Sequence, residues 1–366
     1  MATPNPLENT YPRPSPQVSK KTYNIAGIHC TVFGLEELTL ETKNVACLWL
    51  LNPRLQTQKC MEPIAHSAIR HWNQHKKQKK EQGHSHLGLI AVSFDQRNHG
   101  TREVSPIANE AWKGGNETHA QDMFSIYHGT ALDTSQLITY LPSYIFPSPT
   151  NTHTLTTHLV LGISLGGHSA WHCILHEPLI TAAIVIIGCP DYVRLMSDRA
   201  RLSKRKSWKE STPPGATFLG SADFPNALVK AVEQYDPAGF FLGSVKARTD
   251  ENHEHKPSDS EREKLIPRLK STLGGKRILN LAGGADKLVP YHRSEPFLLW
   301  LKRAIGAGGA AAAWFPDGNI YLEDRVFEGV GHASTPEMLD VANRFIVDTL
   351  EVGGKKAPVL EGPAKL

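Results

Sequence analysis

Residues 158–167 read His-Leu-Val-Leu-Gly-Ile-Ser-Leu-Gly-Gly, and this stretch is the strongest indication of the fold. Its first four residues are a short apolar run typical of a buried strand, and a helical pattern follows Ser164. The Gly-x-Ser-x-Gly spacing at the junction is typical of a sharp strand-to-helix turn that lifts a serine hydroxyl above a sheet. We therefore predict that Ser164 is a nucleophile and that the N–H of Leu165, at the start of the helix, faces a developing oxyanion.

Strand and helix patterns alternate on both sides of this turn. The expected strands are Tyr23–Leu38 (an antiparallel pair), Val45–Asn52, Leu87–Asp95, His158–Ile163, Ile180–Gly188, Arg277–Leu281 and Ile320–Phe327. The expected helices are Glu62–Glu81, Thr118–Tyr140, Leu165–His176, Tyr291–Ile305 and Pro336–Leu350. A regular succession of strand, helix and strand predicts an α/β fold, with a mostly parallel central sheet flanked by helices on both faces.

The alternation stops near Asp191, and this interruption sets the expected domain organisation. We expect a core in two parts, residues 23–190 and 271–352, with a cap or lid insertion at 191–270. A flexible Pro-rich arm is expected at 1–22 and a flexible tail at 353–366. The polar stretch 246–264 within the insertion indicates loop.

The insertion contains a run of basic residues without acidic ones: Arg199, Arg201, Lys204, Arg205, Lys206 and Lys209. Such a run is most often the solvated face of a helix. The alternative is that it contacts the phosphates of a coenzyme A thioester.

A serine hydroxyl needs a base to act as a nucleophile, and two later loops offer an acid and a base. Asp286 follows an apolar strand and a glycine turn, and it comes just before a helix entered at Pro290. His332, in Val330-Gly331-His332-Ala333, lies between the last expected strand and the last expected helix. We predict that His332 is the base for Ser164 and that Asp286 orients it. The alternatives are a helix-capping aspartate and a structural loop histidine.

With these residues in place, the core at 23–190 and 275–352 resembles the α/β-hydrolase superfamily. The stretch Asp95-Gln96-Arg97-Asn98-His99-Gly100 is similar to the Asp-x-Arg-Gly-His-Gly loop after the fourth strand of that fold, where its role is architectural. The Asn-His-Gly form, together with the C-terminus described below, resembles fungal peroxisomal members. The resemblance implies a Ser-His-Asp triad, an acyl-enzyme intermediate, and no metal or organic cofactor.

The sequence departs from the superfamily after the third strand. A His-Gly pair is common there, and its backbone N–H completes the oxyanion hole, but this chain has Asn52-Pro53-Arg54-Leu55. Pro53 has no N–H. Arg54 or Leu55 must therefore supply the second donor, beside Leu165.

Composition restricts the classes of partner. The 366 residues include 40 basic and 36 acidic side chains, which is a weaker positive balance than nucleic-acid-binding proteins usually have. The longest apolar run, Leu179–Cys189, is too short to cross a membrane. The five scattered cysteines predict neither a disulfide framework nor a zinc site.

The two ends of the chain bear on its location. The N-terminal stretch lacks the apolar segment of a secretory signal. Ala364-Lys365-Leu366 is a one-residue variant of the Ser-Lys-Leu peroxisomal address, so we expect an import receptor as a partner and a peroxisomal location, or otherwise a cytoplasmic one.

Together these features predict a serine hydrolase that cleaves a carboxylic ester or thioester of a small acyl substrate, acyl-CoA among them. An acyltransferase or a C–C hydrolase on the same triad is the nearest alternative. A catalytically silent binding protein on this fold is the alternative from another class. The sequence does not decide between hydrolysis and acyl transfer.

Overall fold

The structure of the chain, a computed structural model, describes residues 5–8, 10, 17–79, 87–243, 257–307 and 313–353. The tripeptide Ala364–Leu366 lies outside these ranges, so peroxisomal import stays a prediction. None of the helices within them is long and apolar enough to cross a lipid bilayer.

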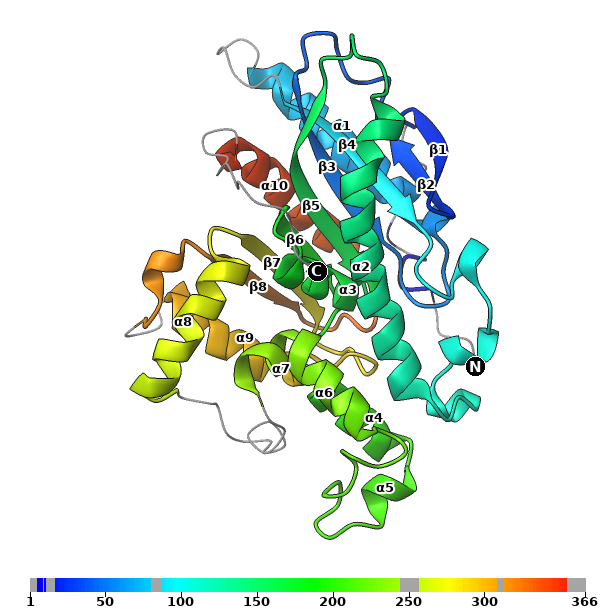
Figure 1. Cartoon of the computed structure of the whole chain (residues 1–366), viewed down its shortest axis with the longest axis vertical. Helices are drawn as coiled ribbons and strands as arrows, with labels where there is room; N and C mark the ends of the chain where they lie inside the picture. The colour runs from blue at the N-terminus through cyan, green and yellow to red at the C-terminus, as the bar shows by residue number, and fades with distance from the viewer. Residues whose placement is uncertain are drawn as a thin grey trace.

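One eight-stranded sheet forms the centre of the molecule (Figure 1). Its strands are β1 (Lys20–Ile25), β2 (Ile28–Phe33), β3 (Asn44–Leu51), β4 (Gly88–Phe94), β5 (Thr154–Ile163), β6 (Ile180–Ile186), β7 (Arg277–Gly283) and β8 (Tyr321–Phe327). They lie in the order β1-β2-β4-β3-β5-β6-β7-β8. Strand β2 pairs antiparallel with β1 and β4. The six strands β3 to β8 are mutually parallel. The mostly parallel sheet predicted from the sequence is therefore confirmed.

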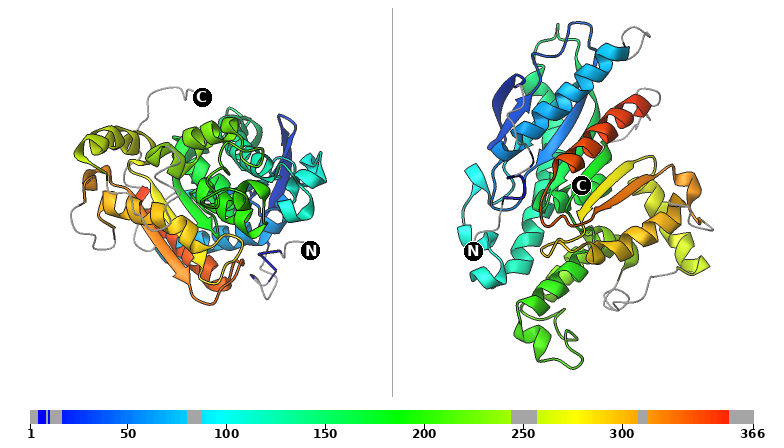
Figure 2. Two further views of the ribbon diagram at one scale, coloured as in Figure 1. Left: turned by 90° about the horizontal axis from the view of Figure 1, so that it is seen from below. Right: turned by 180° about the vertical axis from the view of Figure 1, so that it is seen from behind.

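Helices cover both faces of the sheet, as the two further views in Figure 2 show. Helices α1 (Glu62–Lys79) and α10 (Pro336–Gly353) pack on one face. Helices α2 (His119–Ile145), α3 (Leu165–His176), α8 (Asp259–Leu273) and α9 (Tyr291–Ile305) pack on the other. Short 3-10 turns occupy Gln58–Met61, Gly100–Arg102, Pro106–Asn109, Trp112–Gly114 and Pro316–Gly318.

Strand β3 shows how two helical layers follow from one sequence pattern. Successive side chains of a strand point to opposite faces of the sheet. Val45, Cys47 and Trp49 therefore pack under α2 and α3, whereas Ala46 and Leu48 pack under α1 and α10. A strand buried on both faces is a continuous apolar run, which is why this segment was predictable.

The segment between β6 and β7 leaves the sheet and forms α4 (Tyr192–Leu202), α5 (Lys206–Lys209), α6 (Asn226–Tyr235) and α7 (Pro237–Leu242). We call residues 191–243 the excursion. The buried hydrophobic side chains of α4 and α6 form a third cluster with the first half of α2, whereas Ala238 and Phe241 of α7 join the cluster beneath α2 and α3. Figure 1 shows α4 and α5 beyond the end of the sheet, beside the lower end of α2.

Helix α8 also falls inside the range 191–270 expected for a cap, but it packs on the sheet. Its buried residues Leu265, Leu269 and Leu273 recur every four positions and join the cluster beneath α2, α3 and α9. At the other end of the chain, Lys20–Thr22, which the sequence assigned to the arm, pair with Thr31–Phe33 at the start of β1.

Candidate active site

The turn between β5 and α3 holds Ser164 in a strained conformation. Its backbone angles are φ 54° and ψ −112°, a left-handed value of φ that side chains other than glycine seldom adopt. A Cβ on Gly162 would overlap the carbonyl of Gly166, and a Cβ on Gly166 would overlap that of Leu51. Gly162 is therefore required for the end of β5 to lie this close to the start of α3, and Gly166 for the turn to lie this close to β3.

The structure brings together the three side chains that the sequence predicted for catalysis. Ser164 Oγ lies 2.8 Å from His332 Nε2. His332 Nδ1 lies 2.7 Å from Asp286 Oδ2. Ser164 and His332 are 168 residues apart in the chain, so this contact is a property of the fold. The geometry forms a continuous path for a proton from a hydroxyl to an imidazole that is backed by a carboxylate.

Two loops that bond to each other place Asp286 and His332. Asp286 follows β7 and His332 follows β8, which are neighbouring parallel strands. The N–H of Ala285 donates to the carbonyl of Val330 at 2.9 Å, which joins the two loops. A Cβ on Gly283 would overlap that same carbonyl, so glycine is needed where they cross.

Asp286 is built to remain ionised. Its side chain is fully buried, and Oδ1 accepts hydrogen bonds from the N–H groups of Leu288 at 2.8 Å and Val289 at 2.9 Å. Burial alone would raise the pKa of this carboxyl. The hydrogen bond and charge of His332, with the two backbone donors, hold the pKa below its ordinary value. Asp286 therefore offers His332 a full negative charge at neutral pH.

A cavity of about 310 Å³ opens beside Ser164 and His332. Its apolar wall includes Pro53, Trp112, Met123 and Leu165. Sites for small ligands are commonly of this size, so the cavity can hold a short acyl chain.

Two of the three predicted oxyanion donors line this cavity and one does not. Leu165, at the start of α3, and Arg54 line it, and Leu55 does not. The corner after β3 is a tight turn in which Leu55 has a φ of 62° and the N–H of Gln56 donates to the carbonyl of Pro53 at 3.3 Å. The side chain of Asn52 bonds the carbonyls of Pro53 and Gln56, which fixes the turn.

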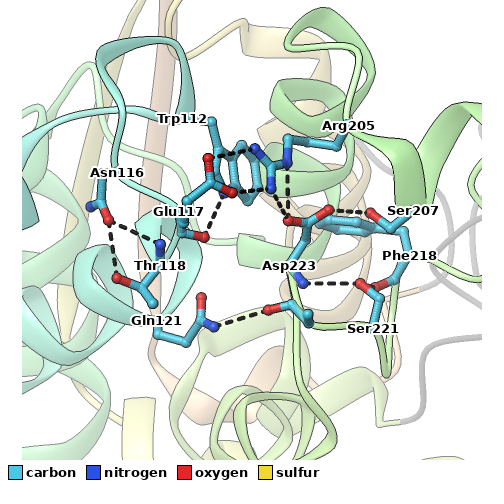
Figure 3. Close-up of polar contacts among 11 residues, drawn as sticks. Trp112, Asn116, Glu117, Thr118, Gln121, Arg205, Ser207, Phe218, Ser221 and Asp223 are labelled. Atoms are coloured by element: carbon cyan, nitrogen blue, oxygen red, sulfur yellow. Dashed lines mark hydrogen bonds and ion pairs between the residues drawn. The ribbon is translucent and has the colours of Figure 1, made fainter.

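The cavity wall at Trp112 is held to the excursion by a group of polar contacts (Figure 3). Arg205 donates to Glu117 Oε2 and to Asp223 Oδ1, each at 2.6 Å. Its guanidinium also lies 5.7 Å from the centre of the Trp112 ring. Because Glu117 precedes α2 and Asp223 belongs to the excursion, Arg205 fastens the excursion to the core beside the cavity.

The Asp95–Gly100 loop does not line the cavity and bonds the 3-10 turn at Gln58–Met61, which follows β3. Asp95 accepts hydrogen bonds from the N–H groups of Gln58 at 2.7 Å and Thr101 at 2.9 Å. His99 is buried, is bonded at Nδ1 to the carbonyl of Arg97 at 2.9 Å, and does not line the cavity. The loop therefore shapes the structure around the corner after β3.

No cluster of potential metal ligands occurs in the part of the chain that the structure describes. The five cysteines are unpaired. Burial raises the pKa of Cys30, Cys60, Cys173 and Cys189 to about 12, so these thiols stay protonated and unreactive at neutral pH.

No known family model and no curated protein matches the sequence. Among solved structures, the chain is similar to TT1662 from Thermus thermophilus, at 18% identity over 93% of this chain and 100% of that chain, with a TM-score of 0.53. The chain has the α/β-hydrolase fold.

Two further structures with this α/β-hydrolase fold are more distant. The acylaminoacyl peptidase of Pyrococcus horikoshii is 12% identical over 95% of this chain and 43% of that chain, with a TM-score of 0.47. Est1E from Butyrivibrio proteoclasticus, determined with ferulic acid bound, is 11% identical over 92% of this chain and 100% of that chain, with a TM-score of 0.42. Identities this low show the fold alone.

The α/β-hydrolase sheet accounts for the place of the site. Ligands of open parallel sheets bind beyond the carboxyl ends of the strands. Ser164 follows β5, Asp286 follows β7 and His332 follows β8, so all three lie at that edge.

The sequence did not predict that several further residues line the cavity, and for Arg199 it offered a ligand contact only as the alternative to a solvated face. Pro6, His119 and Arg199 line the cavity, yet they come from the expected arm, the start of α2 and the basic run of the excursion. Their positions depend on how distant segments fold back over the sheet, and no local pattern encodes that.

Proposed function

We propose that the protein is a serine hydrolase that cleaves a carboxylic ester or thioester through an acyl-enzyme intermediate. The observation that carries this proposal is the hydrogen-bonded path from Ser164 through His332 to Asp286, at 2.8 Å and 2.7 Å, with the cavity opening beside it. The strained φ of Ser164 supports it, because such strain is typical of functional positions.

In the first half of the reaction, Ser164 Oγ attacks the carbonyl carbon and gives its proton to His332 Nε2. The tetrahedral intermediate carries a negative charge on the former carbonyl oxygen. When it collapses, the bond to the leaving alcohol or thiol breaks, and His332 Nε2 returns the proton to that leaving group. Asp286 keeps the Nδ1 proton of His332 in place and stabilises the imidazolium that forms between the two transfers.

In the second half, water attacks the acyl-enzyme, again with His332 Nε2 taking the proton. The acid is released and the proton returns to Ser164 Oγ. The intermediate's oxyanion needs backbone donors in both halves. We assign the N–H of Leu165 to this role, with Arg54 as the second donor in preference to Leu55, because Arg54 lines the cavity.

The test is a panel of p-nitrophenyl esters and acyl-CoA thioesters of graded chain length, measured on the wild type and on Ser164→Ala. We expect turnover to fall on the order of 10³–10⁶-fold in the variant. Ser143→Ala, which removes an exposed hydroxyl at the far end of α2, is the matched control and should be unaffected. Equal turnover in wild type and Ser164→Ala would refute the assigned nucleophile.

The nearest alternative on the same residues is acyl transfer to an alcohol or amine. It differs only in the acceptor that attacks the acyl-enzyme. Adding alcohols or amines to the assay separates the two, because a transferase forms the acceptor's ester or amide in preference to the free acid.

A further inference from the structure

The cavity beside Ser164 has an excess of positive charge. Four basic residues line it, Arg54, Lys113, Arg199 and Lys287, and no aspartate or glutamate is among its described lining residues. Lys113 and Lys287 are exposed, whereas Arg54 and Arg199 are half-buried. The two arginines therefore place charge inside the cavity.

Arg199 comes from α4 and bonds only neutral groups in the described structure. Its Nη1 donates to His119 Nε2 at 3.3 Å and to Met123 Sδ at 2.9 Å, and its Nη2 donates to the carbonyl of Leu288 at 3.2 Å. His119 accepts at Nε2 because its Nδ1 proton donates to the carbonyl of Glu110 at 2.9 Å. Burial, then the charges of Arg199 and Arg54, hold the pKa of His119 well below its ordinary value, so this acceptor is uncharged.

The two carboxylates whose charges act on Arg199 are bonded to other partners. Asp286 is bonded to His332 at 2.7 Å. Asp198 pairs with Arg201 at 2.7 Å and with Arg293 at 2.9 Å. No ion pair of Arg199 itself occurs among the described residues.

The positive charge of Arg199 also acts on Arg54, the other arginine of the cavity lining. Burial, and then repulsion by Arg199, lowers the pKa of Arg54 to about 10, with Glu110 acting in the opposite direction. A half-buried guanidinium such as that of Arg199, which bonds only neutral groups among the described residues, is costly unless an anion joins it. A guanidinium also matches a carboxylate well, because its parallel N–H groups bond both oxygens.

We propose that this cavity selects esters or thioesters whose enclosed part carries a carboxylate, such as half-esters of dicarboxylic acids, and that Arg199 binds this carboxylate with Arg54 adding to the field. The inference rests on the proposed hydrolase function and names its substrate class. The cavity of about 310 Å³ is large enough for a short chain that spans from Ser164 to Arg199, both of which line it.

The test compares two substrates with one leaving group: the mono-p-nitrophenyl ester of adipic acid and the same compound with its free carboxylate capped as a methyl ester. We expect the wild type to prefer the charged ester at least about tenfold in kcat/KM, the effect of one charge-assisted hydrogen bond pair. Arg199→Gln, which keeps hydrogen-bond donors and loses the charge, should lower this preference by about 10–100-fold. Arg199→Lys should retain part of it.

The matched control is Lys206→Gln, an exposed cation of the excursion that does not line the cavity; its preference should equal that of the wild type. Fluorophosphonate labelling of Ser164 and turnover of the capped ester should persist in Arg199→Gln. A purely structural role for Arg199 would lower both esters alike, and that result would overturn the inference while leaving the hydrolase proposal intact.

Two other outcomes also count against the inference. Equal rates for both esters in the wild type would overturn it. If inorganic phosphate inhibited competitively more strongly than adipate, the basic residues of the cavity lining would instead bind a phosphate group. If the wild type neither hydrolysed any of these esters nor was labelled by the fluorophosphonate, the proposed function would be refuted, and the inference with it.

Discussion

The hydroxyl of Thr10 donates a 2.8 Å hydrogen bond to the carbonyl of Ser334, two residues after His332 and 324 positions along the chain. The N–H of Ser334 donates in turn to the carbonyl of Pro6 at 2.8 Å. Both backbone polar groups of Ser334 are thus satisfied by the N-terminal segment, and Pro6 also lines the cavity. The beginning of the chain therefore fixes the loop that bears His332.

Thr10→Val should weaken that attachment. The substitution keeps the shape and leaves the buried carbonyl of Ser334 without its donor, which costs about 1–3 kcal/mol. We expect a lower Tm in thermal unfolding and a lower kcat, because the loop of His332 gains freedom. Thr22→Val, at an exposed position of β1 whose hydroxyl bonds that of Thr31 in β2, is the control. A Thr10 variant that matches this control in both measurements would show that the N-terminal contact is incidental.

Asp286→Asn tests the assigned acid. The amide is isosteric, but it can present a donor where His332 Nδ1 needs an acceptor, and it lacks the charge that stabilises an imidazolium. We expect kcat to fall by about 10⁴-fold with little change in Tm. Asp317→Asn, an exposed position, serves as the control. Wild-type kcat in Asp286→Asn would remove Asp286 from the mechanism.

Stability should fall in mild acid. Burial lowers the pKa of His158 to about 4 and of His168 to about 3, and it places the pKa of His172 well below its ordinary value. Between an unfolded pKa of about 6.5 and these folded values, the unfolded chain binds more protons. The contribution of these three histidines to the free energy of unfolding is therefore fully present above pH 6.5. It is lost as the pH falls toward 4, by up to about 1.4 kcal/mol per pH unit for each histidine.

Unfolding by urea at several pH values measures this slope. His158→Asn keeps an acceptor for Trp49 Nε1, which donates to His158 Nδ1 at 3.2 Å, and should make the slope shallower. His71→Asn, at an exposed position of α1, should leave it unchanged. A free energy of unfolding that does not vary between pH 7 and 5 would contradict the buried neutral histidines.

The two ion pairs of Arg205 should contribute differently to the free energy of unfolding. Asp223 is buried and also accepts from the hydroxyl of Ser207, whereas Glu117 is exposed. We expect Asp223→Asn to lower the free energy of unfolding by about 1–3 kcal/mol, since two donors lose a charged acceptor. Glu117→Gln should leave it within error, because exposed ion pairs contribute little. Equal losses in the two variants would show that burial does not set the strength of this attachment.

The strands and the positions of the three catalytic candidates were predictable because each depends on local sequence. Buried parallel strands are apolar runs, and the turn at Ser164 needs its glycines wherever it occurs. Helix α8 was not expected, because most of its residues are charged or polar. The capping box of Ser258 and Glu261 was a readable signal of its start.

The residues that form the cavity wall could not be predicted from the sequence, because they come together only through contacts between distant segments. Arg199 stands in a run of basic residues and reads as solvated surface, yet it bonds His119 from α2 and Leu288 from the loop after β7. Those contacts exist only once the excursion has folded back. The same holds for Pro6 and Thr10, whose partner is at the other end of the chain.

The central claim is that Ser164 is an activated nucleophile, and a fluorophosphonate probe tests it most directly. Attack by Ser164 Oγ forms an oxygen–phosphorus bond, fluoride leaves, and His332 takes the proton. Mass spectrometry of the digested protein should find the probe on the peptide that contains Ser164, with labelling slowed at least about 100-fold in His332→Ala. Folded wild-type protein that stays unlabelled, or that carries the probe on another residue, would contradict the account.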